Sequence, residues 1–287
     1  MPEYQNIENT IICPQTNTPY LKLEQGDHPC LFVHANGYPS HCYLPMLEQL
    51  MGCTVYAPLS RPCWDLSDPH ATDQWPLLFQ DFLDFARARH QETGHKFSAI
   101  GHSMGCIVLL HAAIEAPELF ENLVFIEPIF LSTSIVETAR LLPKSIKQRM
   151  KIVTKTLNRP DQWPSLQDAF DFHRPKRVFK QLNDPALWQY IVGATSPVEQ
   201  QWHLTYPKAW EAWFYQNPPR SWGLLKKLDL PTLGLRGEKS EFLSQKSWQK
   251  WQRLQPYGKY LEFKNQHHLL PMASPKNVAH AILNFIE

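Results

Sequence analysis

The sequence lacks a hydrophobic run long enough to cross a lipid bilayer. Nowhere in its 287 residues is there a stretch close to the roughly 18 consecutive apolar residues that a spanning helix needs. The opening segment, MPEYQNIENTIICPQ, has neither a basic region nor a sustained apolar region, so we expect no secretory signal peptide. Together these absences predict a cytoplasmic protein without stable membrane insertion.

The sequence also lacks a cysteine or histidine pattern suited to metal binding. The six cysteines are scattered without a CxxC pair, and the thirteen histidines form neither an HExxH motif nor a Cys/His cluster. In a reducing compartment, cysteines with this distribution stay as free thiols. We therefore expect no metal and no organic cofactor.

No excess of charge of one sign is present over the whole chain. The formal net charge is +1, which gives no electrostatic reason to expect a nucleic-acid partner. Apolar residues make up 43% of the chain, which is enough to build a large core and excludes a disordered protein. The length fits one large domain or one domain with an insertion, and the oligomeric state, including a homodimer, is left open.

Short apolar runs alternate with helical patterns in two parts of the chain. The first part predicts strands at 30–34, 54–57, 97–100 and 123–126, with helices at 42–51, 75–89 and 104–116. The last part predicts strands at 231–235 and 260–263, a helix at 244–254, and a final helix that begins at Ser274 and Pro275. This alternation predicts an α/β fold, with a mostly parallel sheet covered by helices on both faces.

The segment between these two parts has a different character. Residues 130–222 show no convincing strand pattern, are rich in Lys, Gln, Trp and Pro, and indicate several short helices. We therefore predict a core domain of residues 1–128 and 223–287 with an inserted helical cap of residues 129–222. Aromatic side chains of this cap either line an apolar pocket or pack the cap onto the core; they are Trp188, Tyr190, Trp202, Trp210, Trp213, Phe214 and Tyr215.

A candidate nucleophile lies in the pentapeptide Gly101-His102-Ser103-Met104-Gly105. The motif connects an apolar strand to an amphipathic helix, which is the context that a G-x-S-x-G nucleophile elbow requires. A tight strand-to-helix turn would expose the Ser103 hydroxyl above the sheet, and the flanking glycines leave room for it. The helix N-terminus supplies the backbone N–H of Met104 to a developing oxyanion.

A second oxyanion donor is expected from the loop after an earlier strand. The segment 31–39, LFVHANGYP, has an apolar strand followed by a histidine and a glycine-containing turn. We expect the backbone N–H groups of Ala35 or Asn36 to serve with that of Met104. His34 is expected to shape this loop by hydrogen bonds rather than to act as the base, and we expect Tyr38 beside the site.

The general base is expected after the last strand, where His267 and His268 are adjacent. We choose His268 because His-x-x-Pro, followed by the start of the final helix, has the usual spacing. The acid that orients the imidazole is expected after the preceding strand. Glu241 is our choice there and Glu238 is an alternative; a further alternative is Glu127, at the end of the strand 123–126.

Taken together, these motifs resemble the α/β-hydrolase superfamily, in particular a bacterial subgroup with a His-Ala-Asn-Gly-Tyr/Phe-Pro oxyanion loop. The chain is similar at 34–39, 101–105, 126–128, 236–241 and 268–275, and the nucleophile–acid–base order is that of the family. It departs from the family after the strand 54–57, where Pro-Leu-Ser-Arg-Pro-Cys-Trp replaces the usual Asp-x-x-Gly-His-Gly-x-Ser. The resemblance implies an α/β-hydrolase fold with His102 next to the nucleophile.

The implied activity is that of a serine hydrolase that cleaves a carboxylic ester or thioester of a small or medium apolar substrate through an acyl-enzyme on Ser103. A serine at the elbow argues against haloalkane dehalogenase and epoxide hydrolase activity, for which relatives use aspartate. Two alternatives stay open. One is a carbon–carbon bond hydrolase of ring-cleavage-type diketones, and the other is a catalytically silent protein that binds a ligand.

Overall fold

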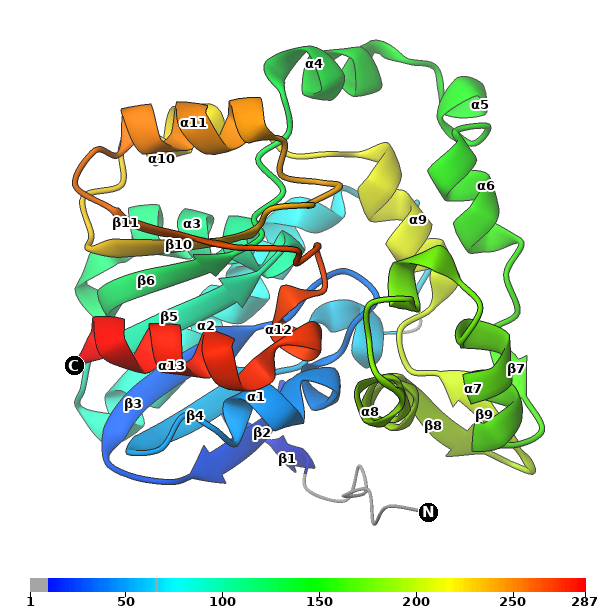
Figure 1. Ribbon diagram of the computed structural model, residues 1–287, viewed down its shortest axis with the longest axis horizontal. Coiled ribbons are helices and arrows are strands. Elements are labelled where there is room, and N and C mark those ends of the chain that lie inside the picture. Colours follow the sequence, from blue (N-terminus) through cyan, green and yellow to red (C-terminus); the bar gives the residue numbers. More distant parts are fainter. Residues whose placement is uncertain (1–9, 66) are drawn as a thin grey trace.

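A computed structural model describes residues 10–65 and 67–287 of the chain (Figure 1). The prediction that the segment 1–15 is not a signal peptide falls mostly outside these residues. The centre of the molecule is a sheet with the strand order β1-β2-β4-β3-β5-β6-β10-β11. Its strands are β1 (Thr10–Ile12), β2 (Pro19–Glu24), β3 (His28–Val33), β4 (Cys53–Pro58), β5 (Phe97–His102), β6 (Phe120–Ile126), β10 (Thr232–Gly237) and β11 (Lys259–Phe263).

Parallel pairing runs through the sheet from β4 to β11, and among the described strands β1 pairs antiparallel with β2, and β2 pairs antiparallel with β4. Strand β6 lies between β5 and β10, with Ile126 in register with both His102 and Leu235. Because parallel strands end at one edge of a sheet, the loops that follow these three strands meet there. The predicted mostly parallel sheet is thus confirmed.

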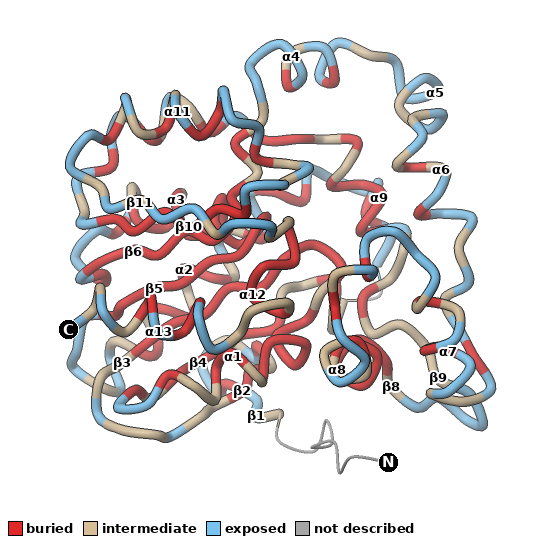
Figure 2. The backbone as a smooth tube through the Cα atoms, in the orientation of Figure 1, coloured by how far each residue is buried: buried red, intermediate tan, exposed pale blue. Residues whose placement is uncertain are grey.

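Helices cover both faces of this sheet. One face carries α1 (Leu44–Leu47), α12 (Leu270–Ala273) and α13 (Pro275–Ile286), and the other carries α2 (Gln74–Thr93), α3 (Met104–Glu115), α10 (Trp222–Leu225) and α11 (Gln245–Leu254). Two buried hydrophobic clusters fill the space on the two faces, and the central strands are buried along their length (Figure 2). Among the described residues, no helix is long and apolar enough to cross a membrane.

The helix expected at 42–51 is shorter than predicted. A 3₁₀ turn, η2 (Ser40–Tyr43), leads directly into α1, which ends at Leu47. Three leucines of the predicted helix, Leu44, Leu47 and Leu50, are nevertheless all buried. Further 3₁₀ turns outside the segment 129–222 are η3 (Arg61–Cys63) and η4 (Pro117–Leu119).

Residues 129–222, here called the insertion, form a separate group of elements beside the sheet (Figure 1). Its helices are α4 (Thr133–Leu141), α5 (Lys144–Lys147), α6 (Lys151–Leu157), α7 (Leu166–His173), η5 (Arg177–Phe179), α8 (Asp184–Ala194) and α9 (Lys208–Gln216). The prediction that this segment has no strands is wrong: β7 (Gln162–Trp163), β8 (Thr195–Val198) and β9 (Gln201–Leu204) form an antiparallel sheet in the order β7-β9-β8. These strands are too short to show alternation, and Pro197 lies in one of them. The division of the chain into core and cap domains stays a prediction.

Helix α8 attaches the insertion to the core. Its Gly193 lies so close to η2 that an added Cβ would approach the backbone nitrogen of Cys42 to 2.6 Å. The Gln189 amide donates a hydrogen bond of 3.0 Å to the carbonyl oxygen of His41. This close backbone approach fixes one side of the insertion directly next to the loop that follows β3.

Candidate active site

Ser103 occupies a strained turn between β5 and α3. Its φ of 55° and ψ of −112° lie outside the regions that non-glycine residues normally adopt. The neighbouring glycines make the turn feasible: a Cβ on Gly101 would come within 2.8 Å of the Cys106 nitrogen, and a Cβ on Gly105 would overlap the carbonyl group of Val33. The structure therefore has the nucleophile-elbow geometry that the pentapeptide predicted.

The imidazole of His268 lies between Ser103 and a buried carboxylate. Its Nε2 is 2.9 Å from Ser103 Oγ, and its Nδ1 is 3.0 Å from Oε2 of Glu127. With the Nδ1–H donating to the carboxylate, Nε2 is left as the acceptor for the serine hydroxyl. These three groups come from the ends of β5, β6 and β11, and they form a continuous serine–histidine–carboxylate chain.

Glu127 is held in place from three sides. Its carboxylate accepts hydrogen bonds from the Gly237 backbone N–H at 2.6 Å, from the Ser240 hydroxyl and from His268, and its side chain is fully buried. Its backbone φ of 50° is unusual for a glutamate, and its N–H donates to the carbonyl of Leu235 on β10. Such strain next to a buried polar network is typical of functional sites.

The structure corrects the expected geometry of the acid. Glu241 accepts from Nδ1 of His267 at 2.8 Å and from the backbone N–H of His268 at 3.4 Å, so its carboxylate contacts the base loop rather than the His268 ring. Its side chain is also 43% exposed. The reason is the strand order: the end of β6 lies one strand from β5, whereas the end of β10 lies two strands away.

Glu238 contacts neither the ring of His268 nor Ser103 among the described residues. Its carboxylate accepts a hydrogen bond of 2.9 Å from the backbone N–H of Asn265, and it thereby braces the turn after β11. Its position gives it a role in the loop and no contact with the base.

The loop after β3 lies against the elbow. His34 donates from Nδ1 to the carbonyl of Ala35 at 2.8 Å and accepts at Nε2 from the Ser60 backbone N–H at 2.9 Å, so it braces this loop as expected. Burial lowers the pKa of His34 to about 4, which keeps the ring neutral. The N–H of Ala35 points to the Tyr43 hydroxyl at 3.3 Å, whereas the N–H groups of Asn36 and Met104 have no hydrogen-bond partner among the described residues.

His102 connects this loop to the base. Its Nε2 lies 2.9 Å from the carbonyl oxygen of His268, and its Nδ1 lies 2.7 Å from the Tyr43 hydroxyl. Burial drives the pKa of His102 well below its usual value, so the ring is neutral and carries one proton. The proton must lie on Nε2 because a carbonyl can only accept, so Tyr43 donates to Nδ1 and itself accepts from Ala35.

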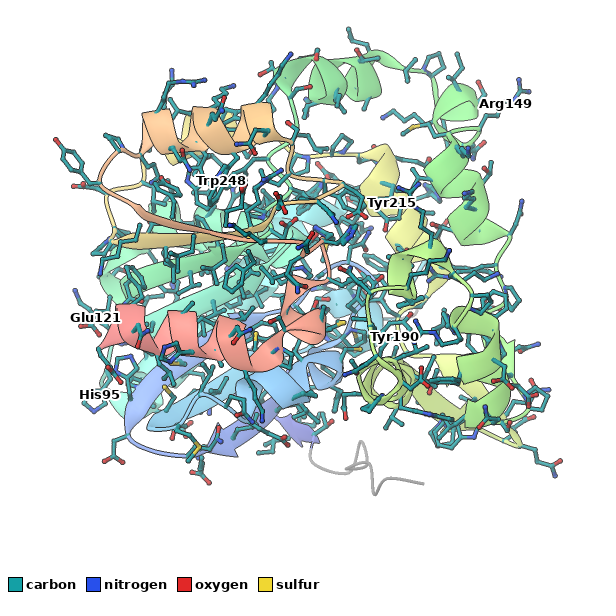
Figure 3. The ribbon with its side chains drawn as sticks, in the orientation of Figure 1. His95, Glu121, Arg149, Tyr190, Tyr215 and Trp248 are labelled. Carbon is teal, nitrogen blue, oxygen red and sulfur yellow. The ribbon has the colours of Figure 1, made fainter. Side chains whose placement is uncertain are left out.

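A cavity of about 910 Å³ opens between the core and the insertion, and His268 forms part of its wall. Tyr38 of the loop after β3, as well as Tyr190 and Tyr215 of the insertion, also line it. Figure 3 shows the two labelled insertion tyrosines on the side that faces the core. Cavities of roughly 300–1,000 Å³ hold small-molecule ligands, so this is the candidate substrate site.

Four of the other aromatic candidates from the sequence have a packing role. Trp210, Trp213 and Phe214 of α9 are buried in the hydrophobic cluster that also contains residues of α2 and α3. Trp188 stacks on Phe170 with ring centroids 4.5 Å apart. Of the aromatic candidates from the sequence, Tyr190 and Tyr215 are thus the two that line the cavity.

A largely buried ion pair in the cavity wall lies next to the loop after β3. Arg159 forms a two-pronged pair with the carboxylate of Glu211, which also accepts from the Tyr215 hydroxyl at 3.2 Å. The same carboxylate lies 2.9 Å from the position that a Cβ on Gly37 would take. Sequence reasoning missed Arg159, Glu211, Tyr43 and Ser240, because none of them belongs to a recognisable motif.

The fold and the site geometry define the class of protein as an α/β-hydrolase. The model of the alpha/beta hydrolase family matches residues 30–281, and the chain belongs to this family. A comparison with curated proteins gives no match.

Solved structures share the fold over nearly the whole chain. E-2-(acetamidomethylene)succinate hydrolase is 18% identical, with a TM-score of 0.78 and coverage of 96% of this chain and 97% of that one. The peroxisomal α/β-hydrolase of Saccharomyces cerevisiae is 16% identical, with a TM-score of 0.74 and coverage of 98% and 85%. The thioesterase domain from the curacin biosynthetic pathway is 16% identical, with a TM-score of 0.67 and coverage of 93% and 99%. At these identities the likeness shows the fold alone.

Proposed function

We propose that the protein is a serine hydrolase that cleaves a carboxylic ester or thioester through an acyl-enzyme on Ser103. The observation that carries this proposal is the continuous chain from Ser103 Oγ to His268 Nε2 at 2.9 Å and from His268 Nδ1 to Glu127 at 3.0 Å. The strained elbow and the neighbouring unpartnered N–H groups support the same chemistry. Glu127 takes the role of the acid in this proposal, in place of Glu241.

In the first half of the reaction, Ser103 Oγ attacks the substrate carbonyl carbon while Nε2 of His268 takes the hydroxyl proton. The carbonyl oxygen becomes an oxyanion, which accepts hydrogen bonds from the N–H groups of Asn36 and Met104. Ala35 is not used, because its N–H is directed to Tyr43. The imidazolium of His268, stabilised by Glu127, then gives its proton to the leaving alcohol or thiol.

In the second half, water attacks the acyl carbon. His268 takes one proton from this water, and the other stays on the hydroxyl group that enters the acid product. The collapse of the second tetrahedral intermediate returns the proton to Ser103 Oγ and releases the carboxylic acid. Each step uses only groups of this chain and one water molecule, so no cofactor enters the proposal.

The thioester alternative is retained, since one of the structural neighbours is a thioesterase domain. The chemistry on Ser103 is the same for both, and only the leaving group differs. The substrate is proposed to be a small molecule that occupies the cavity of about 910 Å³.

Labelling with a fluorophosphonate probe tests this proposal directly. We expect the wild-type protein to be labelled on Ser103 and the Ser103→Ala variant to stay unlabelled. A series of p-nitrophenyl esters of increasing chain length would then report turnover. A folded wild-type protein that resists the probe and leaves all esters intact would favour the catalytically silent alternative.

A further inference from the structure

The charge of the chain is distributed unevenly between the insertion and the rest. Residues 129–222 contain thirteen Lys and Arg against seven Asp and Glu, which gives +6, whereas the remaining residues carry −5. Within the insertion, the stretch 140–159 has seven Lys and Arg and no acidic residue. The near-zero net charge of the whole chain is therefore the sum of a basic insertion and an acidic remainder.

Part of this positive charge reaches the cavity that His268 lines. Lys155 of α6, together with Lys176 and Arg177 before and at the start of η5, belongs to the cavity wall, and we call these three the cationic rim. All three are exposed, and none forms an ion pair with another described residue. The Lys176 ammonium lies 4.2 Å from the centre of the Phe172 ring, which also lines the cavity.

The acidic residues of the cavity wall already have partners. Glu211 is paired with Arg159, and Glu241 accepts from the ring of His267. Neither carboxylate forms an ion pair with a cation of the rim among the described residues. Because the cavity wall also includes the rings of Tyr38 and Phe242, the positive field acts next to surfaces of low polarity, where it is screened less than in bulk water.

We propose that the substrate carries a negative charge away from its scissile carbonyl, and that the cationic rim binds this charge while the carbonyl lies at Ser103. The proposal rests on the proposed function and narrows the substrate class to anionic esters or thioesters. Two sources supply such a charge: a carboxylate at the far end of the acyl chain, or the phosphates of a coenzyme A leaving group.

Matched probes separate these two sources. Mono-p-nitrophenyl glutarate is compared with the neutral p-nitrophenyl butyrate, and butyryl-coenzyme A is compared with the neutral S-butyryl-N-acetylcysteamine. We expect kcat/KM for one anionic probe to exceed that of its neutral counterpart by about tenfold at low salt. The advantage should shrink as ionic strength rises, because salt screens exposed charges.

A matched pair of triple variants tests the role of the rim. Lys155→Gln/Lys176→Gln/Arg177→Gln should lower the ratio of anionic to neutral kcat/KM to near one. The control Lys144→Gln/Arg149→Gln/Lys151→Gln removes the same charge from cations of the insertion that do not line the cavity, and should keep most of the ratio. Arg149 lies at the outer edge of the insertion in Figure 3. Thermal melting would verify that both variants are folded.

Binding to the Ser103→Ala variant separates failure of this proposal from failure of the proposed function. If the wild type cleaves neutral probes as well as anionic ones, and the rim variant leaves the ratio unchanged, the proposal is overturned while the hydrolase function stands. A second outcome is that no probe is cleaved, but calorimetry shows that Ser103→Ala binds the anionic probe. If this affinity is lost when the rim is neutralised, the proposal stands without the hydrolase function. Neither cleavage nor binding would overturn both.

Discussion

Nε2 of His102 lies 2.9 Å from the main-chain carbonyl oxygen of His268, 166 residues further along the chain. Through its other nitrogen the same ring contacts Tyr43, which accepts from the loop after β3. One neutral imidazole thus ties the position of the base to the position of that loop. In this series of hydrogen bonds, the carbonyl of His268 can only accept, and this sets the direction of each of the other bonds.

The first prediction concerns the connection that His102 makes between His268 and the loop after β3. His102→Asn removes the donor at the Nε2 position, whereas His102→Gln places an amide nitrogen near that position. We expect His102→Asn to lower kcat by about ten- to hundredfold with little change in KM, because a small displacement of His268 misaligns proton transfer. His102→Gln should recover part of the loss. Equal effects of both variants, or a change in KM alone, would contradict a positioning role.

The second prediction concerns acid stability. Burial lowers the pKa of four histidines to about 4, and they are His34, His41, His111 and His173. In the unfolded chain they would titrate near their ordinary value of about 6.5, so the unfolded state binds more protons between these two values. Their contribution to stability is therefore complete above pH 6.5 and is lost progressively as the pH falls towards 4.

Thermal melting between pH 7.5 and 4 would measure this effect. We expect the melting temperature to fall as the pH decreases below about 6.5, as the linkage requires. Replacing His111, which lies far from the proposed chemistry in α3 and stacks on Phe79, by Gln should flatten the pH dependence. A melting temperature that is constant from pH 6.5 to 4 would show that these rings are not held neutral.

The third prediction concerns the elbow. Gly105→Ala would place a methyl group on the carbonyl of Val33, so the strand and the helix must separate. We expect the variant to lose several kcal/mol of unfolding free energy, or to fail to fold, as severe overpacking does. Gly223→Ala is the matched control, because a Cβ there meets nothing within 4 Å. Similar stability of the two variants in urea unfolding would argue against the close packing at the elbow.

The fourth prediction concerns the ion pair beside the loop after β3. Arg159→Gln leaves the Glu211 carboxylate, whose side chain is 5% exposed, without its partner. We expect a loss of about 3 kcal/mol of unfolding free energy and a drop in kcat, because an unpaired negative charge near Asn36 opposes an oxyanion. Arg159→Gln/Glu211→Gln should regain most of both. A double variant as impaired as the single one would show that the uncompensated charge is not the cause.

Much of the site was predictable from the sequence because its parts are local. A serine between glycines at a strand–helix junction, and a histidine after the last strand, are recognisable wherever the remaining chain folds. The choice between Glu127 and Glu241 was different, since it depends on the strand order β5-β6-β10, which no local pattern contains. The left-handed backbone of Glu127, which turns its carboxylate towards His268, is likewise set by the surrounding packing.

The insertion was predicted least well for a related reason. Its strands are two to four residues long, and they are held by pairing with one another rather than by burial of an alternating face. The net positive charge of the insertion, in contrast, can be counted from the sequence once the boundaries of the insertion are known. The net charge of +1 for the whole chain does not reveal this positive charge, because acidic residues outside the insertion offset it.

In the proposed triad, Glu127 is the acid that supports His268 on Ser103. Steady-state hydrolysis of an activated ester by Glu127→Gln and Glu241→Gln tests it most directly, because both variants remove one charge at nearly constant shape. We expect Glu127→Gln to lower kcat by about 10³–10⁴, the scale expected when the acid of a triad is neutralised. Glu241→Gln should stay within about tenfold of the wild type. Near-normal turnover by Glu127→Gln, together with a large loss in Glu241→Gln, would contradict the account.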